Sequence, residues 1–140
     1  MIRLLVVDDN AAIRAAVSEL CAAAGDVAVV AECSDGSGAA DAARQSSPDV
    51  VLMDLSMPGT GGLAATRQVL AERADARVVV LTGSFSVDSV REAQAIGAVG
   101  YLLKDGDPVE LLRRVRDVAA GGTAWGAAAT ATLRSHPPNG

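Results

Sequence analysis

The sequence is poor in aromatic residues, in histidine and in lysine: it has three aromatic side chains, one histidine and one lysine among twelve basic residues. Its two cysteines, Cys21 and Cys33, have no CxxC spacing, and its only histidine, His136, lies far from both. These scarcities exclude the zinc-binding and the disulfide-rich classes of small protein. We expect two small thiols in a reducing compartment, with a disulfide as the less favoured alternative.

Charge and hydropathy exclude two further classes. The net charge is −5 and the arginines are scattered, whereas a nucleic-acid surface needs clustered basic residues. No apolar run approaches the roughly 20 residues that cross a bilayer, and residues 1–7 have the length of a strand and lack the features of a signal peptide. The sequence therefore predicts one domain of 140 residues, half of them apolar, in the cytoplasm and without membrane contact.

Five short apolar runs alternate with segments of helical periodicity. We predict strands at Arg3–Val7, Val27–Glu32, Val50–Asp54, Arg77–Thr82 and Val99–Leu103. Because these runs are apolar almost throughout, they suit strands that are covered on both faces, as in a parallel sheet. The predicted class is α/β.

Capping and breaking residues delimit the helices between the strands. The first helix is expected between Asn10 and Gly25, the second over Asp35–Ser47, the third after the run PGTGG and the fourth over about 86–96. The fifth is expected to begin after Asp107, with Pro108 in its first turn and Glu110 completing a capping box, and to end at the glycines 121–122. Residues 1–122 are thus predicted to form the domain, and residues 123–140 a C-terminal tail or the start of a linker.

Reactive side chains stand at the ends of four predicted strands. Asp8 and Asp9 follow the first strand, Asp54 and Thr82 end the third and fourth, and Lys104, the only lysine, follows the fifth. Ligands of open α/β sheets bind outside the carboxyl ends of the strands, so these groups should converge if the first and third strands are neighbours. Three carboxylates in one pocket repel one another unless a cation compensates, and hard oxygen ligands suit Mg²⁺. Each residue also has an ordinary explanation as a helix cap, a strand end or a surface lysine, but together they favour a functional site.

The motifs VVDDN, LMDLSMPGTGG, VVVLTG and GYLLKD, in this order, resemble the receiver domain of two-component response regulators. The resemblance spans residue 1 to about 122 and is strongest to the LuxR/NarL-type subfamily, whose receivers precede a helix-turn-helix domain. It implies a flavodoxin-like, doubly wound sheet of five parallel strands in the order 2-1-3-4-5, with five helices.

The same resemblance implies the chemistry of the site. Asp54 would be the phosphoacceptor, taking a phosphoryl group from a sensor histidine kinase. The magnesium ligands would be the carboxylates of Asp8, Asp9 and Asp54 and the backbone carbonyl of Ser56. Thr82 would bond a phosphoryl oxygen, and Lys104 would pair first with Asp54 and then with the phosphoryl group. Such a protein catalyses only its own phosphorylation and dephosphorylation and is not otherwise an enzyme.

The resemblance also implies a switch and an output. Thr82 would move toward the phosphoryl group, and Tyr101 would turn inward into the space that Thr82 leaves; an ordinary half-exposed strand tyrosine is the alternative. The face formed by the fourth helix, the fifth strand and the fifth helix would change shape and serve as the output surface. We expect homodimers on phosphorylation, and control of transcription through DNA-binding by an output domain outside this sequence.

Some alternatives stay open at this point. Many receivers have a cis proline after the strand-five lysine, but here Asp105 follows, so the isomer of that bond is undetermined. A phosphatase of the haloacid dehalogenase type would need a second aspartate where Ser56 stands, and a flavin mononucleotide carrier would not place VVDDN against a phosphate. A receiver-shaped interaction module that works without phosphorylation is the main rival.

Overall fold

The strands form where β-branched and leucine side chains follow one another, and they build one six-stranded parallel sheet. The computed structural model describes residues 1–135, with strands β1 (Ile2–Val7), β2 (Val27–Cys33), β3 (Val50–Met53), β4 (Val78–Thr82), β5 (Gly100–Leu103) and β6 (Ala124–Trp125). Their order is β2-β1-β3-β4-β5-β6, and each neighbouring pair is parallel. The predicted class, the order of the first five strands and their bounds to within one residue are confirmed.

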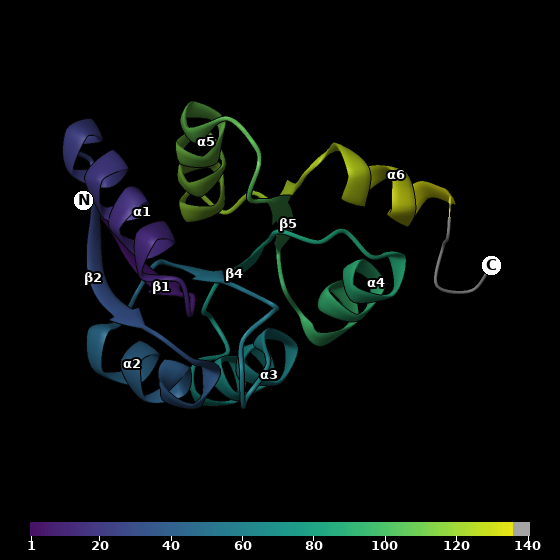
Figure 1. The fold of residues 1–140 in the computed structure, drawn as a ribbon, viewed down its shortest axis with the longest axis horizontal. Coiled ribbons are helices and arrows are strands. Elements are labelled where there is room, and N and C mark those ends of the chain that lie inside the picture. Colours follow the sequence, from purple (N-terminus) through teal and green to yellow (C-terminus); the bar gives the residue numbers. More distant parts are fainter. Residues whose placement is uncertain (136–140) are drawn as a thin grey trace.

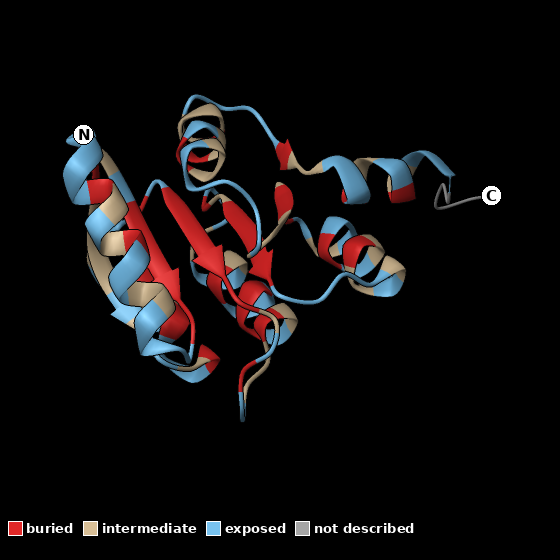
Figure 2. Cartoon of the chain, turned by 45° about the horizontal axis from the view of Figure 1, so that its top comes forward, coloured by how far each residue is buried: buried red, intermediate tan, exposed pale blue. Residues whose placement is uncertain are grey.

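Helices cover both faces of the sheet (Figure 1). Helices α1 (Ala11–Ala24) and α5 (Pro108–Ala119) lie on one face, and α2 (Ala39–Ser46), α3 (Gly62–Glu72) and α4 (Val87–Ile96) lie on the other. Successive residues of β1 enter different cores: Leu4 and Val6 pack in the core under α1 and α5, and Leu5 and Val7 in the core over α2 and α3. Every residue of β3 and β4 is buried, which explains the continuous apolar runs of these strands (Figure 2).

The ends of α1 and α5 lie at the predicted caps, but the helix expected over Asp35–Ser47 is divided into a 3-10 turn at Gly36–Gly38 and α2. The Asn10 side chain accepts hydrogen bonds from the backbone N–H groups of Ala12 and Ile13, and Asp107 accepts one from Val109. The capping box predicted for α5 is wrong, because the Glu110 carboxylate forms ion pairs with two arginines of its own helix, Arg113 and Arg114. Arginines one turn further along a helix compete with the backbone N–H of the cap residue for such a glutamate.

The prediction of five strands and five helices is wrong at the C-terminal end. Strand β6 pairs with β5, and helix α6 (Ala127–Ser135) lies beside α4, with Ala129 and Thr132 buried (Figure 1). A strand of two residues is too short to leave a period in the sequence, and the buried side of α6 consists of small residues. The predicted tail therefore contributes an edge strand and a packed helix; its His136 and proline pair lie outside the described residues.

Two further expectations concern the cysteines and the length of the apolar helices. Cys21 and Cys33 are free thiols, and burial is the main cause that raises the pKa of each thiol. Within residues 1–135, no helix combines the length and the apolar character that a bilayer crossing requires.

Candidate functional site

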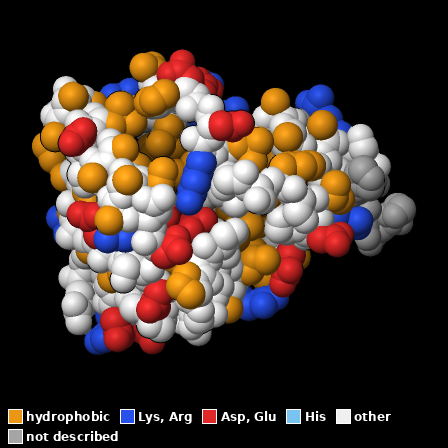
Figure 3. Space-filling view, in the orientation of Figure 1, with side chains coloured by type: hydrophobic (Ala, Val, Ile, Leu, Met, Phe, Trp, Pro, Cys, Tyr) orange, Lys and Arg blue, Asp and Glu red, His pale blue; other side chains and the backbone are white. Residues whose placement is uncertain are grey.

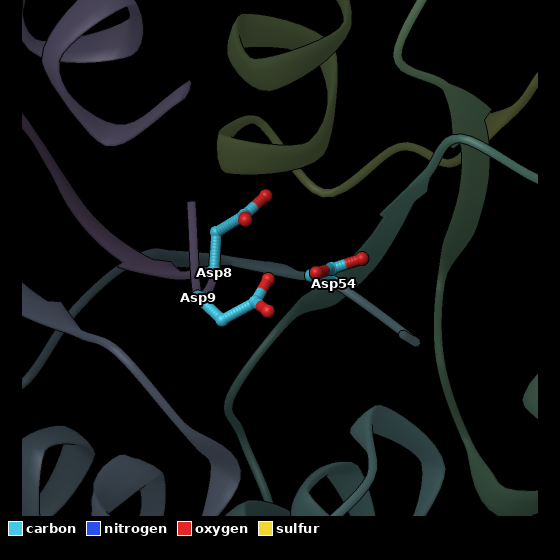
Figure 4. A group of neighbouring side chains, drawn as sticks. All are labelled: Asp8, Asp9 and Asp54. Atoms are coloured by element: carbon cyan, nitrogen blue, oxygen red, sulfur yellow. The ribbon is translucent and has the colours of Figure 1, made fainter. Parts of the chain in front are cut away.

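Three carboxylates converge at the carboxyl ends of β1 and β3. Asp8 and Asp9 follow β1, Asp54 follows β3, and the two strands are paired up to Val7 and Met53. Oxygen atoms from the three side chains all lie within 4.8 Å of one another (Figure 4). Asp8 and Asp54 are each 2% exposed, whereas Asp9 is exposed. The site thus offers one open side and three hard oxygen ligands, a donor set that fits Mg²⁺.

Lys104 reaches this pocket from the end of β5. Its Nζ lies 2.7 Å from Asp8 Oδ2 and 3.3 Å from Asp54 Oδ1. In the space-filling view, one basic side chain lies against a group of acidic ones on this face (Figure 3). The contact with Asp54 was expected from the sequence, but the shorter contact with Asp8 was not. One ammonium therefore neutralises part of the charge of two buried carboxylates.

Burial and charge shift the proton affinities of this pair. Burial, and then the negative charge of Asp8, raise the pKa of Asp54, while a hydrogen bond from the Ser56 backbone N–H (3.2 Å) and the ammonium of Lys104 act against the rise. Burial disfavours the charged form of Lys104, but its hydrogen bond to Asp8 and the charge of Asp54 outweigh this and raise its pKa. Lys104 thus stays protonated, and the ionised Asp54 is left short of positive charge, which a divalent cation can supply.

Thr82 ends β4 and Ser56 follows β3, so both lie at the same edge of the sheet as the carboxylates. Thr82 is fully buried at the end of β4, and its Oγ1 accepts a hydrogen bond from the Ser84 N–H (3.2 Å) and donates one to the Ser84 carbonyl (3.4 Å). Ser56 is exposed two residues after Asp54. Asp8, Asp9, Asp54 and Lys104 are therefore brought together, while the Thr82 hydroxyl is engaged with the loop that follows β4.

Tyr101 has its side chain buried against α4. Its hydroxyl lies 2.9 Å from Ser89 Oγ and donates a hydrogen bond of 3.2 Å to the Ser84 carbonyl. Phe85 meets its ring edge-on, with 6.4 Å between the centroids. The expected ordinary alternative, a half-exposed strand tyrosine, does not describe this residue, which is 1% exposed. Thr82 and Tyr101 thus share one partner, the backbone of Ser84.

The turn after β5 settles one open point. The described residues contain no cis peptide bond, so the bond between Lys104 and Asp105 is trans. The Lys104 N–H donates to the Thr82 carbonyl (2.8 Å), which continues the pairing of β4 and β5 for one more residue. The lysine backbone is thereby fixed without a cis bond after it.

Two residues that shape the site were missed at the level of sequence. A Cβ atom on Gly62 would lie 2.1 Å from the Asp54 carbonyl oxygen, so only glycine allows α3 to start against the end of β3. Arg14 of α1 bonds the Asp8 carbonyl. The only signal for Gly62 was the run PGTGG, which also fits an ordinary loop, and Arg14 looked like any exposed position of an amphipathic helix.

An apolar groove of about 880 Å³ lies beside the carboxylates. Its lining comes mainly from α1, α5, the turn after β5 and the start of α6, and includes Ile13, Leu20, Leu102, Pro108 and Leu111. Lys104 also borders it, but none of the three aspartates does. Figure 3 shows hydrophobic side chains around a hollow above the acidic group. The groove therefore lies next to the carboxylate site and does not contain its three aspartates.

Comparisons with known proteins agree on one family. The profile described as the response regulator receiver domain matches residues 4–116. The chain is 38% identical over 121 residues to the transcriptional regulatory protein LiaR of Bacillus subtilis, covering 86% of this chain and 57% of LiaR, and equally identical to the response regulator UvrY of Escherichia coli, covering 86% and 56%. The chain thus spans a little over half the length of these relatives.

Solved structures give the same result. A LuxR-family two-component response regulator from Aurantimonas sp. SI85-9A1 is 32% identical, with a TM-score of 0.88 over 95% of each chain. The signal receiver domain of the putative response regulator NarL from Mycobacterium tuberculosis is 33% identical, with a TM-score of 0.81 over 86% of this chain and 97% of that one.

Proposed function

This chain belongs to the response regulator receiver domain family, and from that premise we propose that it is a phosphoacceptor of two-component signalling with Asp54 as the acceptor. The observation that carries the proposal is the arrangement of Asp54 between two further carboxylates and the ammonium of Lys104 at one edge of the sheet. A degenerate interaction module has no physical need for three mutually repelling carboxylates, two of them buried. The rival reading without phosphorylation is therefore disfavoured.

The proposed reaction is phosphoryl transfer from a phosphohistidine of a sensor kinase. An Asp54 carboxylate oxygen attacks phosphorus, the new O–P bond forms, and the P–N bond breaks as the imidazole leaves. Asp8, Asp9 and Asp54, with the Ser56 carbonyl, would hold Mg²⁺, which supplies positive charge to the phosphoryl oxygens when bound. Lys104 turns its ammonium from the aspartates to the new anion, and Thr82 donates its hydroxyl to a phosphoryl oxygen.

The proposed switch begins at Ser84. If the Thr82 hydroxyl turns to the phosphoryl group, it leaves its two hydrogen bonds to the Ser84 backbone, and Ser84 also holds the Tyr101 hydroxyl. A change in the hydrogen bonds between Thr82 and Ser84 therefore alters the position of the Ser84 carbonyl that Tyr101 contacts. Tyr101 is also connected to α4 through Ser89. The proposed output face is α4, β5 and α5, and part of this face is covered by α6.

The family also indicates the partners of this chain. The phosphoryl donor is a sensor histidine kinase, and the apolar groove between α1 and α5, which reaches Lys104, offers the kinase a docking surface. Phosphorylation favours a homodimer, in the cytoplasm, and any contact with DNA is made by an output domain. We keep the boundary of the receiver domain near residue 122. The residues after it, which pack on the receiver as β6 and α6, would lead to that output domain, because the chain spans only 57% of LiaR and 56% of UvrY.

Intact mass after incubation with acetyl phosphate tests this proposal. With Mg²⁺ present, we expect the wild-type chain to gain the mass of one phosphoryl group, and with a chelator to gain none. Asp54→Asn, which keeps the shape of the side chain, should gain none in either case. Absence of an adduct on the wild type, or an adduct that persists in Asp54→Asn, overturns the proposal.

A further inference from the structure

Arg14 ties the aspartate-bearing turn to two neighbouring elements. It stands in the first turns of α1, and its Nη1 donates a hydrogen bond of 2.6 Å to the backbone carbonyl of Asp8. Its Nε lies 3.3 Å from Glu32 Oε1 on β2. The Arg14 side chain is 19% exposed and the Glu32 side chain 45%, so the guanidinium is largely covered while the carboxylate of its ion pair stays open to water. The guanidinium thus bridges α1, β2 and the peptide unit between Asp8 and Asp9.

Asp9 is the carboxylate that depends on this peptide unit. Asp8 has direct support from Lys104 (2.7 Å) and from the Asn10 N–H (2.9 Å), and Asp54 has support from Lys104 and Ser56. Within residues 1–135, the Asp9 carboxylate has neither a hydrogen bond nor an ion pair, although it extends toward Asp54 (Figure 4). Its position is therefore determined by its backbone, and Arg14 holds the carbonyl directly before it.

Resting on the function proposed above, we infer that Arg14 is a positioning residue for the magnesium site: it fixes the Asp8–Asp9 peptide so that the Asp9 carboxylate stays within ligand distance of the other two. Arginine suits this role because its planar fork can donate to a carbonyl and to a carboxylate at once. Residues that orient metal ligands change metal affinity by roughly 10- to 100-fold when removed, without touching the metal.

The test is the dependence of phosphorylation on Mg²⁺. Initial rates with acetyl phosphate are measured by intact mass over a range of Mg²⁺ concentrations for the wild type, Arg14→Met and Glu32→Gln. We expect Arg14→Met to need about tenfold more Mg²⁺ for half of its maximal rate, with the rate at saturating Mg²⁺ close to that of the wild type. Glu32→Gln, which keeps the arginine but weakens its anchor, should shift in the same direction by less.

Two controls separate positioning from general destabilisation. Arg44→Met removes an exposed arginine of α2 that forms an ion pair with Asp41, and should leave the Mg²⁺ dependence unchanged. Melting temperatures with and without Mg²⁺ are recorded for every variant, and the rates are measured well below the lowest of them. A variant that is merely less stable loses maximal rate, whereas a variant with a misplaced ligand loses Mg²⁺ affinity.

The outcomes are distinct. Without an adduct on the wild type, the proposed function fails. With an adduct on the wild type but an unchanged Mg²⁺ midpoint in both Arg14→Met and Glu32→Gln, the role of Arg14 fails while the proposed function stands. Should Arg14→Met not fold, the midpoint of Glu32→Gln decides by itself.

Discussion

At the scale of the residue, the site is dominated by the mutual repulsion of carboxylates. Asp8, Asp9 and Asp54 were predicted from the sequence because the carboxyl ends of parallel strands share one edge of a sheet. Their supports were not predicted: Arg14 and Gly62 act through closeness in space, which has no period or motif of its own. Sequence thus indicates which groups gather at the site, and the structure adds what holds them in place.

The repulsion leads to a prediction about stability. In the presence of a chelator, Asp54→Asn should raise the melting temperature. The substitution removes one charge from a pocket in which, among residues 1–135, Lys104 is the only cation that forms an ion pair with the carboxylate of Asp8 or Asp54. Mg²⁺ should then raise the melting temperature of the wild type more than that of the variant, since ligand binding stabilises the folded state. Thermal melts with and without Mg²⁺ check this, and a variant that melts below the wild type in chelator contradicts the account.

At the scale of the element, the caps and apolar runs of the first 122 residues determined most of the secondary structure. Asn10, Gly25 and Asp107 act at the ends of α1 and α5 as predicted. Strand β6 and helix α6 were missed because they are stabilised by what they pack on and not by their own pattern. Tertiary context is decisive for elements this short.

An ion pair between two elements predicts a pH dependence. Arg116 of α5 donates to both oxygens of Asp26, just before β2, at 2.7 and 3.0 Å. The hydrogen bond from Arg116 is the main cause that lowers the pKa of Asp26. A lowered folded-state pKa adds stability above the unfolded pKa, and this stability is lost as the pH falls through the folded pKa.

Asp26→Asn should therefore melt below the wild type near pH 7, and the gap should close as the pH falls to about 3. Because both side chains are substantially exposed, the effect should be small and should shrink in high salt. Asp105→Asn is the control, an exposed aspartate with no ion pair to any residue in the described part of the chain. A difference in melting temperature between wild type and Asp26→Asn that widens toward low pH contradicts this prediction.

The pairing of β5 and β6 predicts the effect of a single methyl group. A Cβ atom on Gly100 would lie 2.7 Å from the Ala124 carbonyl oxygen and 2.8 Å from the Ala124 Cβ, so Gly100→Ala should push β6 off the edge of the sheet. Trp125, the only tryptophan of the chain, reports this as a red shift of its fluorescence. Gly38→Ala is the control, because a Cβ there meets only the Cys33 sulfur at 4.0 Å. Unchanged emission of Gly100→Ala argues against the pairing.

At the scale of the whole molecule, the alternation of strands and helices predicted a parallel sheet, but the spatial order of the strands came from the resemblance and not from the pattern. The order puts β1 and β3 side by side, and without it the carboxylates would not meet. It also places β5 close enough for Lys104 to reach both buried aspartates. The site is thus a property of the topology as much as of the residues.

The molecule as a whole is expected to change its association state. With Mg²⁺ and beryllofluoride, which mimics a phosphoryl group, light scattering should show dimers where the untreated protein is monomeric. Asp54→Asn should stay monomeric under both conditions. Wild-type monomers that persist with beryllofluoride would contradict the proposed dimerisation without touching the assignment of Asp54.

The assignment of Asp54 itself is tested most directly by trapping the acyl phosphate. Borohydride reduces an aspartyl phosphate to homoserine, so treatment of the phosphorylated chain followed by peptide mass spectrometry marks the residue that carried the group. We expect homoserine at position 54 alone, in samples that received both Mg²⁺ and a phosphoryl donor. Homoserine at Asp8, at Asp9 or at any other aspartate, or an unmodified position 54, would contradict it.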